Sequence, residues 1–354
     1  MKFLSFLILC FSMLLFEVKA QDPSFSQIDN TLSYYHASHT SLNSGYGMNT
    51  AFRRQWSQIP GGFNTMWMNG SFCPKDKATS FGLNFLNDVE GAALIKTQKL
   101  DLQFRQKIKM GFSKTKWLRS FSIGGYLGVS IKSLDWSKLV FSDQIDPVFG
   151  IHQNSAQLQP NIENAIFYDC GISVTSNVIF KTQELRIPVT IHTSLNHFYS
   201  RGNESLQGLE TIYPRLFVLT ATGTIQKNQF FGTPLLKPSF QLEVQRTLHR
   251  IKFGSLVGYI GDESGNSIYF GTYYSTFVNY RYKVNAAAII PLIGYERSMK
   301  QNIFSIAYSY DVVVKGLNVA AAGGIHEITL SITYNTGKNK FNQGSNVFSK
   351  CPEF

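Results

Sequence analysis

Long apolar runs are rare in this sequence. Among its 354 residues, the one extended apolar run, Phe3 to Phe16, lies inside the first 20. A membrane-spanning helix needs about 20 consecutive apolar residues, so we expect no helical span. No stretch shows a helical apolar stripe longer than about three turns either, which argues against an α-helical domain.

Charged residues are also scarce, at 16% of the chain, whereas aromatic residues reach 14% and glycines number 28. This mixture is typical of strands with one polar and one apolar face. The formal net charge of +11 would suggest a nucleic-acid partner in a soluble protein. Here the cations are scattered between predicted strands. We therefore expect solvated charges, some of them facing outer-membrane lipid, and no nucleic acid partner.

The cysteines form no clear metal-binding motif and indicate no defined set of disulfides. Of the four cysteines, Cys10 falls in the apolar run, and Cys73, Cys170 and Cys351 lack the spacing of a zinc site. One disulfide with one free thiol could form among these three, in any pairing.

The histidines provide no catalytic group. His326-Glu327 matches the start of a zinc-protease motif, but Leu330 stands where the second histidine belongs. His192 and His197 lie five residues apart on a predicted strand, so we expect them on opposite faces with no carboxylate partner. No Gly-x-Ser-x-Gly motif occurs. We therefore expect no enzyme, no catalytic residue, no bound metal and no cofactor.

The first 20 residues have the features of a signal peptide. Lys2 supplies the positive end, Phe3 to Phe16 the apolar segment, and Val18-Lys19-Ala20 a small-residue cleavage site. We expect cleavage after Ala20. The mature chain then begins at Gln21, outside the inner membrane.

Residues 119–132 show the pattern that the rest of the chain repeats. Large apolar side chains such as Ile123 and Leu127 alternate with small or polar ones such as Ser122 and Ser130. A period of two indicates a β-strand between a polar and an apolar environment, and the length suits a tilted membrane strand. The predicted strands lie near 46–56, 62–73, 79–88, 95–109, 119–132, 166–176, 185–198, 212–226, 235–247, 250–260, 267–276, 284–297, 301–314 and 324–335.

An even number of antiparallel strands can close into a ring with no free edge, as a membrane requires. The sequence therefore predicts an all-β fold, a transmembrane antiparallel outer-membrane β-barrel of about 14 strands. Its predicted parts are a signal peptide (1–20), an N-terminal periplasmic segment (21–45), the barrel (46–335) and a C-terminal periplasmic tail (336–354). The longest connection, roughly 133–165, then lies on the outward side. A soluble β-sandwich competes, but these strands are long and aromatic residues crowd their ends.

Charged residues on the polar faces of these strands are expected to line the lumen. They could form the wall of a diffusion channel or pair with one another into a plug. The residues assigned to the lumen are Asp101, Arg105, Lys132, Arg186, Glu243 and Glu327.

Five segments of the mature chain carry a family likeness. They are Gln21–Gln27 (QDPSFSQ), Leu134–Pro147 (LDWSKLVFSDQIDP), Tyr308–Asp311 (YSYD), Gly323–Leu330 (GGIHEITL) and Cys351–Phe354 (CPEF). In this order they resemble the PorP/SprF family of type IX secretion and gliding-motility outer-membrane proteins. Residues 28–35 depart from the family pattern, which usually has an Asn-Pro-rich stretch there.

The resemblance implies a barrel that serves secretion and cell-surface attachment of large partner proteins. Family members work beside a cognate secreted protein, often an adhesin, whose C-terminal sorting domain the barrel receives and holds at the surface. Other members belong to the core type IX secretion machinery and contact its periplasmic subunits. We expect the first role, with the core role and a diffusion channel as alternatives.

The acidic stretch of the long outward connection carries a partner-binding hypothesis. Trp136 would be an aromatic anchor of the kind that dominates protein interfaces, with Asp135, Asp143, Gln144 and Asp146 around it. The alternative is structural. Trp136 would then lie in the outer aromatic girdle and the aspartates would cap turns, Asp146 especially, because Asp-Pro favours turn initiation. A calcium site is disfavoured because the spacing matches no known loop.

Overall fold

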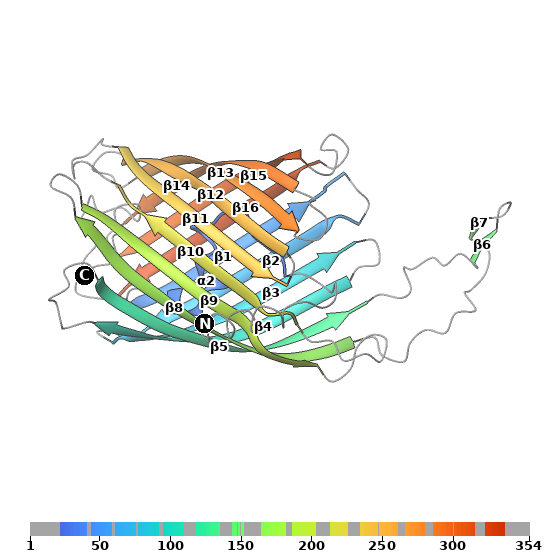
Figure 1. The fold of residues 1–354 in the computed structure, drawn as a ribbon, viewed down its shortest axis with the longest axis horizontal. Helices are drawn as coiled ribbons and strands as arrows, with labels where there is room; N and C mark the ends of the chain where they lie inside the picture. Colours follow the sequence, from blue (N-terminus) through green and yellow to red (C-terminus); the bar gives the residue numbers. More distant parts are fainter. Residues whose placement is uncertain are drawn as a thin grey trace, which may run out of the picture.

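The computed structural model describes residues 22–40, 44–58, 61–75, 77–91, 95–109, 118–134, 144–146, 148, 150–151, 164–181, 186–202, 213–225, 234–246, 248–260, 266–279, 286–299, 301–315 and 323–336. Within these residues, 14 antiparallel strands form one closed barrel (Figure 1). This confirms the predicted fold class and the predicted number of strands.

The strands follow one another around the ring in chain order. β1 pairs with β16, which closes the ring, and β5 pairs with β8 across the longest connection. The barrel strands are β1 (Gly45–Gln55), β2 (Phe63–Cys73), β3 (Thr79–Glu90), β4 (Ile95–Lys109), β5 (Leu118–Ser133), β8 (Asn164–Lys181), β9 (Arg186–Gly202), β10 (Leu216–Gly223), β11 (Pro234–Gln245), β12 (Leu248–Ile260), β13 (Asn266–Asn279), β14 (Ala286–Ser298), β15 (Asn302–Lys315) and β16 (Ile325–Asn335).

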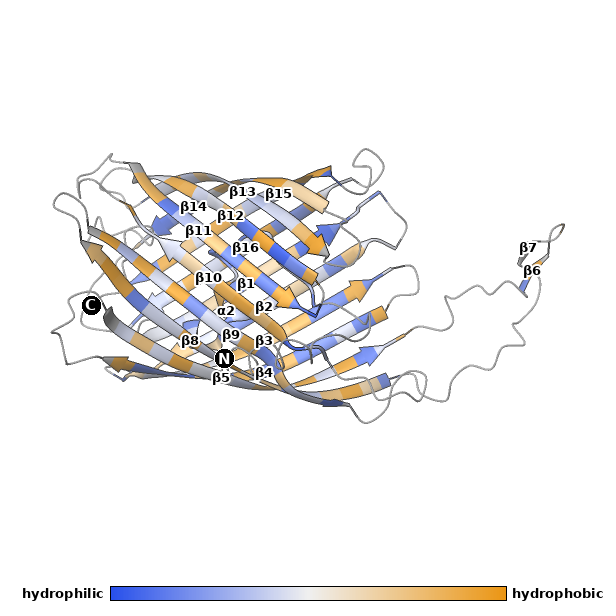
Figure 2. Ribbon diagram, in the orientation of Figure 1, coloured by the Kyte–Doolittle hydropathy of each residue, from blue (hydrophilic) through white to orange (hydrophobic). Residues whose placement is uncertain are grey.

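The strands put apolar side chains on the outside of the ring and polar ones inside. On β5, Leu127 is 70% exposed, whereas Ser122 and Ser130 are buried. Figure 2 shows this alternation of hydrophobic and hydrophilic residues along the strands. Lipid covers such an outward apolar face, while the inward polar groups need partners within the barrel.

The connection between β5 and β8 carries a small second sheet. β6 (Ile145–Asp146) and β7 (Gly150–Ile151) pair as a hairpin. In Figure 1 this hairpin lies well apart from the barrel, beyond the end at which β5 stops and β8 starts. We call that end of the barrel the hairpin end. Ile145 is 57% exposed and Val148 is 80% exposed.

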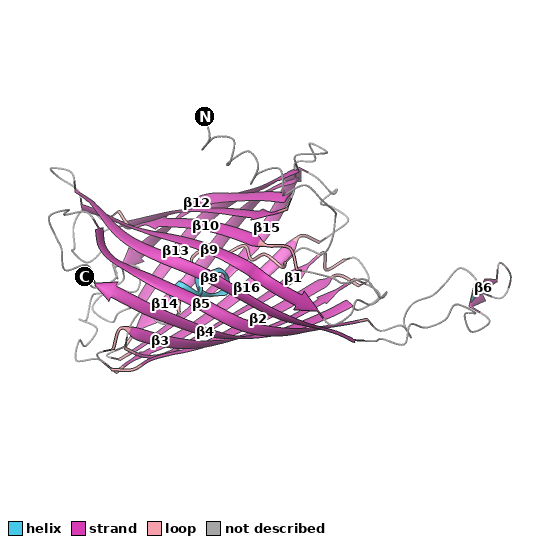
Figure 3. Cartoon of the chain, turned by 60° about the horizontal axis from the view of Figure 1, so that its bottom comes forward, coloured by secondary structure: helices cyan, strands magenta, loops and turns pink. Residues whose placement is uncertain are grey.

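Residues 22–40 lie inside the ring of strands, and we call them the lumen segment. They contain the short helix α2 (Leu32–Tyr35) and the 3-10 turn η1 (Ala37–His39), and Figure 3 shows the helical part within the barrel. No helix among the described residues is both long and apolar enough to cross a membrane. Residues 21–45 were predicted to lie in the periplasm, whereas the described part, 22–40, lies within the barrel.

The lumen segment runs from the hairpin end of the barrel toward the opposite end. Asp22 contacts His197 and Gln245, near the hairpin ends of β9 and β11. Thr40 contacts Gln103 and Arg105, on the half of β4 nearer the opposite end. The segment is polar, and its polar groups find partners among the inward polar groups of the strands. This satisfaction of buried polar groups explains why the segment lies inside the barrel.

Gly124 on β5 makes room for η1. A Cβ atom at this position would lie 2.6 Å from the carbonyl carbon of Ala37 and 2.6 Å from the Cα of Ser38. Both distances are far inside van der Waals contact. Only glycine therefore fits at position 124 when the lumen segment is docked.

Replacing Gly124 with valine should displace the lumen segment while the ring stays closed. The new side chain takes the space of η1, whereas the strand pairing of β5 uses only backbone groups. We expect faster hydrogen exchange at residues 37–40 and new protease cleavage within the segment. Gly70→Val is the matched control, because a Cβ at Gly70 meets nothing within 4 Å. Unchanged exchange in Gly124→Val would contradict the docked arrangement.

Candidate functional site

The first cluster that holds the lumen segment lies at the seam where the ring closes, on β1, β15 and β16. Glu327 accepts hydrogen bonds from the backbone N–H groups of Ser26 at 2.7 Å and Gln27 at 2.9 Å. It also pairs with Arg53 at 2.9 Å. The Ser26 hydroxyl donates to Asp311 at 2.6 Å, and Arg53 pairs with Asp311 at 3.3 Å. Buried charges persist only when partners surround them, so the segment completes the environment of these carboxylates.

A second cluster centres on Glu243 of β11. Its carboxylate lies 2.8 Å from Lys252 and 2.8 Å from Arg250, both on β12. It also accepts a hydrogen bond from the Ser24 hydroxyl at 3.0 Å. Lys252 in turn donates to the backbone carbonyl of Phe25. Lys252 also donates to the Ser24 hydroxyl at 3.2 Å, so the lumen segment supplies one donor and two acceptors to this buried ion-pair group.

A third cluster forms around Asp29 of the lumen segment. Asp29 pairs with Lys237 at 2.7 Å and accepts hydrogen bonds from Tyr273 at 2.7 Å and Ser239 at 2.9 Å. The preceding residue, Ile28, is fully buried in an apolar cluster that includes Tyr273. Polar and apolar contacts therefore alternate along the segment, and both fix its position against β11 and β13.

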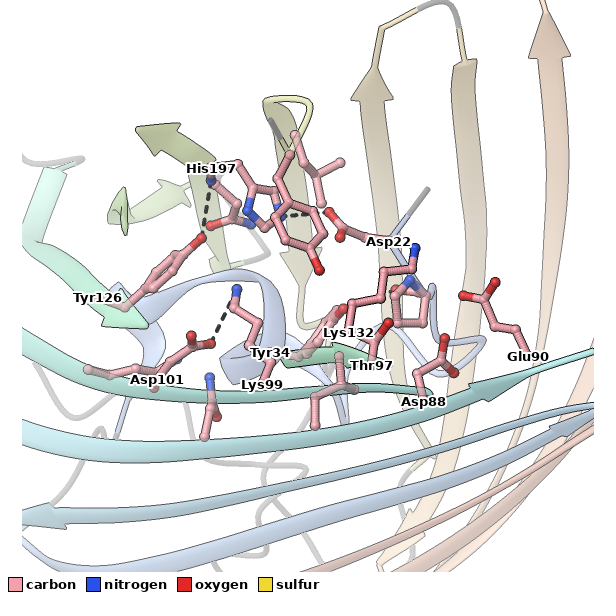
Figure 4. Close-up of a pocket in the computed structure, with 17 residues that line it drawn as sticks. Asp22, Tyr34, Asp88, Glu90, Thr97, Lys99, Asp101, Tyr126, Lys132 and His197 are labelled. Carbon is pink, nitrogen blue, oxygen red and sulfur yellow. Dashed lines mark hydrogen bonds and ion pairs between the residues drawn. The ribbon is translucent and has the colours of Figure 1, made fainter. Parts of the chain in front are cut away.

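At the hairpin end, His197 of β9 lies between two carboxylates. Its Nε2 is 2.8 Å from Asp22 of the lumen segment, and its Nδ1 is 2.8 Å from Asp169 of β8. Asp169 also pairs with Lys99 at 2.8 Å and accepts a hydrogen bond from the Tyr126 hydroxyl at 3.1 Å. Burial alone would raise the pKa of Asp22, but the charges of His197 and Lys99 outweigh it and lower that pKa. Figure 4 shows His197 linked to both Asp22 and Tyr126.

This arrangement contradicts the expectation for the two histidines of β9. Five residues apart on a regular strand, His192 and His197 would face opposite ways, yet both are buried. The register of β9 against β8 shifts between Cys170 and Ile172, and His197 has a φ of 54°. This bulge turns His197 inward, onto two carboxylates that its spacing in the sequence did not reveal.

Three imidazoles meet where the lumen segment crosses β9. The ring of His36 stacks on that of His192 with centroids 5.2 Å apart, and the ring of His39 lies 5.0 Å from His192. The Nε2 of His36 is 2.9 Å from the hydroxyl of Thr220. Burial and the neighbouring His192 lower the pKa of His36 and of His39 well below the ordinary value, so both rings are neutral. No group of three or more His, Cys, Asp or Glu side chains in the described part of the chain is arranged to hold a metal ion.

A polar pocket lies beside Asp22 at the hairpin end (Figure 4). Its space of about 700 Å³ includes open solvent. Lys99 reaches into it but is already paired, at 3.5 Å with Asp101 and 2.8 Å with Asp169. The charged residues that line the pocket are Asp22, Asp88, Glu90, Lys99, Asp101, Lys132 and His197.

The residues that the sequence analysis assigned to the lumen fall into three groups. Lys132 lines the pocket, and the side chain of Arg186 lies outside the described residues. The side chains that are buried within the barrel are Asp101, Arg105, Glu243 and Glu327. Glu243 and Glu327 contact the lumen segment directly.

The proposed partner-binding residues all belong to the connection between β5 and β8. Gln144 is half-buried and Asp146 lies in β6. Asp135, Trp136, Asp143 and the side chain of Asp146 lie outside the described residues. Their role in binding therefore stays a prediction.

Sequence reasoning missed the residues that fix the lumen segment. Arg53, Asp311 and Lys252 are on the polar faces of predicted strands, and each is buried. Such charges require partners, so their presence on inward faces was a signal that something polar fills the barrel. The identity of that segment could not be read from spacing, because Ser26 and Glu327 are 301 residues apart in the chain.

Replacing Glu327 with glutamine should loosen the start of the lumen segment. The variant breaks a buried ion pair with Arg53, a loss that typically costs about 3 kcal/mol, or about a hundredfold in an opening equilibrium. We expect hydrogen exchange of the Ser26 and Gln27 amides to accelerate by about that factor. His326→Gln is the control. His326 is the residue before Glu327 on β16, but its ring contacts Tyr308 on the exposed face of the barrel. Equal effects of both variants would show that Glu327 does not hold the segment.

Acid should also loosen the lumen segment. In the docked segment the pKa values of His36 and His39 are lowered, so both side chains are neutral. In a released segment each histidine has its ordinary pKa of about 6.5 and binds a proton below that pH. Docking is therefore most stable above about pH 6.5 and weakens as the pH falls below it. Protease cleavage within 22–40, compared near neutral pH and near pH ~5, measures this change. The double variant His36→Gln, His39→Gln should reduce the pH dependence, and a dependence equal to that of the parent protein would contradict the assignment.

Comparison with known proteins identifies the family of this chain. A sequence model described as type IX secretion system membrane protein PorP/SprF matches residues 17–332. No curated protein sequence matches the chain. Solved structures with a similar fold include the TodX monoaromatic hydrocarbon channel deltaS2 mutant, at 10% identity and a TM-score of 0.45 over 86% of this chain and 94% of that chain. The COG4313 outer membrane channel from Pseudomonas putida F1 gives 10% identity and a TM-score of 0.40 over 89% and 99%.

The matched range includes the whole lumen segment and reaches into β16, the last strand of the barrel. The closed ring with an outward apolar face is that of an outer-membrane protein. The chain belongs to the PorP/SprF family of type IX secretion system membrane proteins.

Proposed function

We propose that this barrel receives and anchors a cognate secreted surface protein, an adhesin, through the C-terminal sorting domain of that partner. Family membership supports a role in type IX secretion. The observation that carries the finer proposal is the lumen segment, because residues 22–40 of the chain lie inside its own barrel. A barrel occupied by its own chain is better suited to hold a partner at its surface than to pass solutes.

The contacts of the lumen segment argue against free diffusion as the main function. Glu327 and Asp311 bind it at the seam, Glu243 and Lys252 bind it on the neighbouring wall, and His197 binds its first described residue. These bonds connect the segment to both halves of the ring. A diffusion channel would need all of them to open together, at a cost of several kcal/mol for each buried charge left unpaired.

The connection between β5 and β8 is the proposed partner-binding element. Its hairpin stands apart from the barrel and exposes Ile145 and Val148 (Figure 1). A two-stranded hairpin of this size is marginal on its own in water, and a strand added by a partner would stabilise it. We include in the binding surface Asp135, Trp136, Asp143, Gln144 and Asp146, with Trp136 as the aromatic anchor.

We propose that the lumen segment docks after the signal peptide is removed. The signal peptide 1–20 is removed after Ala20, and Asp22 then docks on His197. We propose the barrel at 46–335 and a periplasmic tail at 336–354, so that the hairpin end faces outward. The alternative role, a core secretion component, would use the opposite end of the barrel to contact periplasmic type IX subunits.

Gentle detergent purification of the tagged protein from outer membranes tests the proposal. We expect a large secreted protein with a C-terminal sorting domain to copurify. Its recovery should fall at least about tenfold when Trp136 is replaced by alanine, since an aromatic anchor typically contributes 2 kcal/mol or more. Tyr46→Ala is the control, because Tyr46 is an exposed aromatic residue at the start of β1, at the opposite end of the barrel.

Two other outcomes would overturn the anchoring role. Recovery of periplasmic secretion subunits alone would make the protein a core component. Recovery of the barrel alone, with steady conductance in a planar bilayer, would make it a channel. Conductance that appears only in Gly124→Val would instead support a barrel that is closed by its lumen segment.

A further inference from the structure

The wall of the barrel is interrupted at one place on β9. Cys170 pairs with Tyr199 and Ile172 pairs with Leu195, so the three residues Asn196 to Phe198 lie opposite the single Gly171. His197, inside this bulge, has a φ of 54°, a conformation that favours glycine and is strained for histidine. The ion pairs of His197 with Asp22 and Asp169 hold the strained residue from the lumen side.

The bulge changes which side chains face the lipid. His197 points into the barrel, whereas the next two residues, Phe198 and Tyr199, are 50% and 58% exposed. In a regular strand these two neighbours would face opposite sides. The alternation resumes at Ser200, which is buried. The bulge therefore places two consecutive aromatic side chains on the outside of the ring.

Two arginines flank these aromatic side chains. The guanidinium carbon of Arg215, just before β10, lies 6.0 Å from the ring centroid of Phe198. Arg201 pairs across the ladder with Tyr168 of β8, which is also exposed. Both arginines are exposed, and neither forms an ion pair with a carboxylate in the described part of the chain. We call Tyr168, Phe198, Tyr199, Arg201 and Arg215 the arginine–aromatic patch.

The position of the patch defines what it can bind. It lies at the hairpin end of β8, β9 and β10, while Ile172 and Val174 continue the outward apolar face of β8 toward the membrane centre. Aromatic rings at such a boundary sit at the level of lipid headgroups. A guanidinium at the same level matches phosphate oxygens with two parallel hydrogen bonds. Among the described residues, no carboxylate pairs with either arginine.

We propose that the arginine–aromatic patch binds the phosphate-bearing headgroup of outer-leaflet lipopolysaccharide. Arg201 and Arg215 bind the phosphate, and Tyr168, Phe198 and Tyr199 pack on the sugar and the start of the acyl chains. The site depends on the bulge, because a regular β9 would turn Phe198 or Tyr199 into the lumen. Assignment to the outer leaflet rests on the proposed outward orientation of the hairpin end.

Lipid binding by the purified full-length protein in detergent tests this site. Native mass spectrometry would count bound lipopolysaccharide, bound phosphatidylglycerol and bound phosphatidylcholine, each added separately. We expect lipopolysaccharide to bind best, and the double variant Arg201→Gln, Arg215→Gln to weaken its binding at least about tenfold. Arg54→Gln is the matched control, since Arg54 is also exposed but lies on β1, far around the ring.

Several results would overturn the proposal. Equal losses of lipopolysaccharide binding in the double variant and in Arg54→Gln would mean that the binding depends on surface positive charge in general and not on this patch. Equal binding of lipopolysaccharide and of its dephosphorylated form would exclude the guanidinium–phosphate contact. A preference for phosphatidylglycerol would exclude lipopolysaccharide as the ligand. Because these readouts do not involve the secreted partner, their failure is distinguishable from failure of the proposed anchoring function.

Discussion

Every strand of the barrel has to find hydrogen-bonding partners on both sides, because lipid offers none to backbone N–H and C=O groups. Pairing of β1 with β16 meets that requirement by closing the ring. Closure also creates an interior that is cut off from the apolar phase. Arg53, Glu243 and Glu327 project into that interior, so each must be neutralised and hydrogen-bonded by protein atoms.

The lumen segment provides the hydrogen-bonding partners that the charged groups of the interior need. It has few charges of its own and many hydroxyls, amides and backbone groups, which bind carboxylates and ammonium groups without adding a strong repulsion. Ser24 and Ser26 show this most clearly, since each bonds to a carboxylate that is already paired with a cation. The lumen segment and the wall of the barrel therefore form one polar network, so a substitution in either one alters the hydrogen bonds and ion pairs of the other.

The sequence predicted the wall well because one physical rule governs it. Alternation of apolar and polar residues reports which face meets lipid, and it placed β5 at 119–132 against an observed Leu118–Ser133. It did less well on β8, predicted at 166–176 but extending to Lys181, since Val178 and Ile179 are both buried and the alternation stops there. The lumen segment was not predicted, because its binding depends on residues distant in the chain. The bulge at His197 was not predicted either, because backbone irregularities leave no periodic signal.

The place of the lumen segment in the chain has a consequence for assembly. It precedes β1, and its Ser26 contacts both the first strand, at Arg53 on β1, and the last, at Glu327 on β16. The two strands that close the ring are thus tied to the same short stretch, Ser26 and Gln27. A chain that bound this stretch early would bring its two ends together across nearly its whole length and shorten the search for the closing register. Under that order of events, the segment would template closure of the ring as well as occupy the finished barrel.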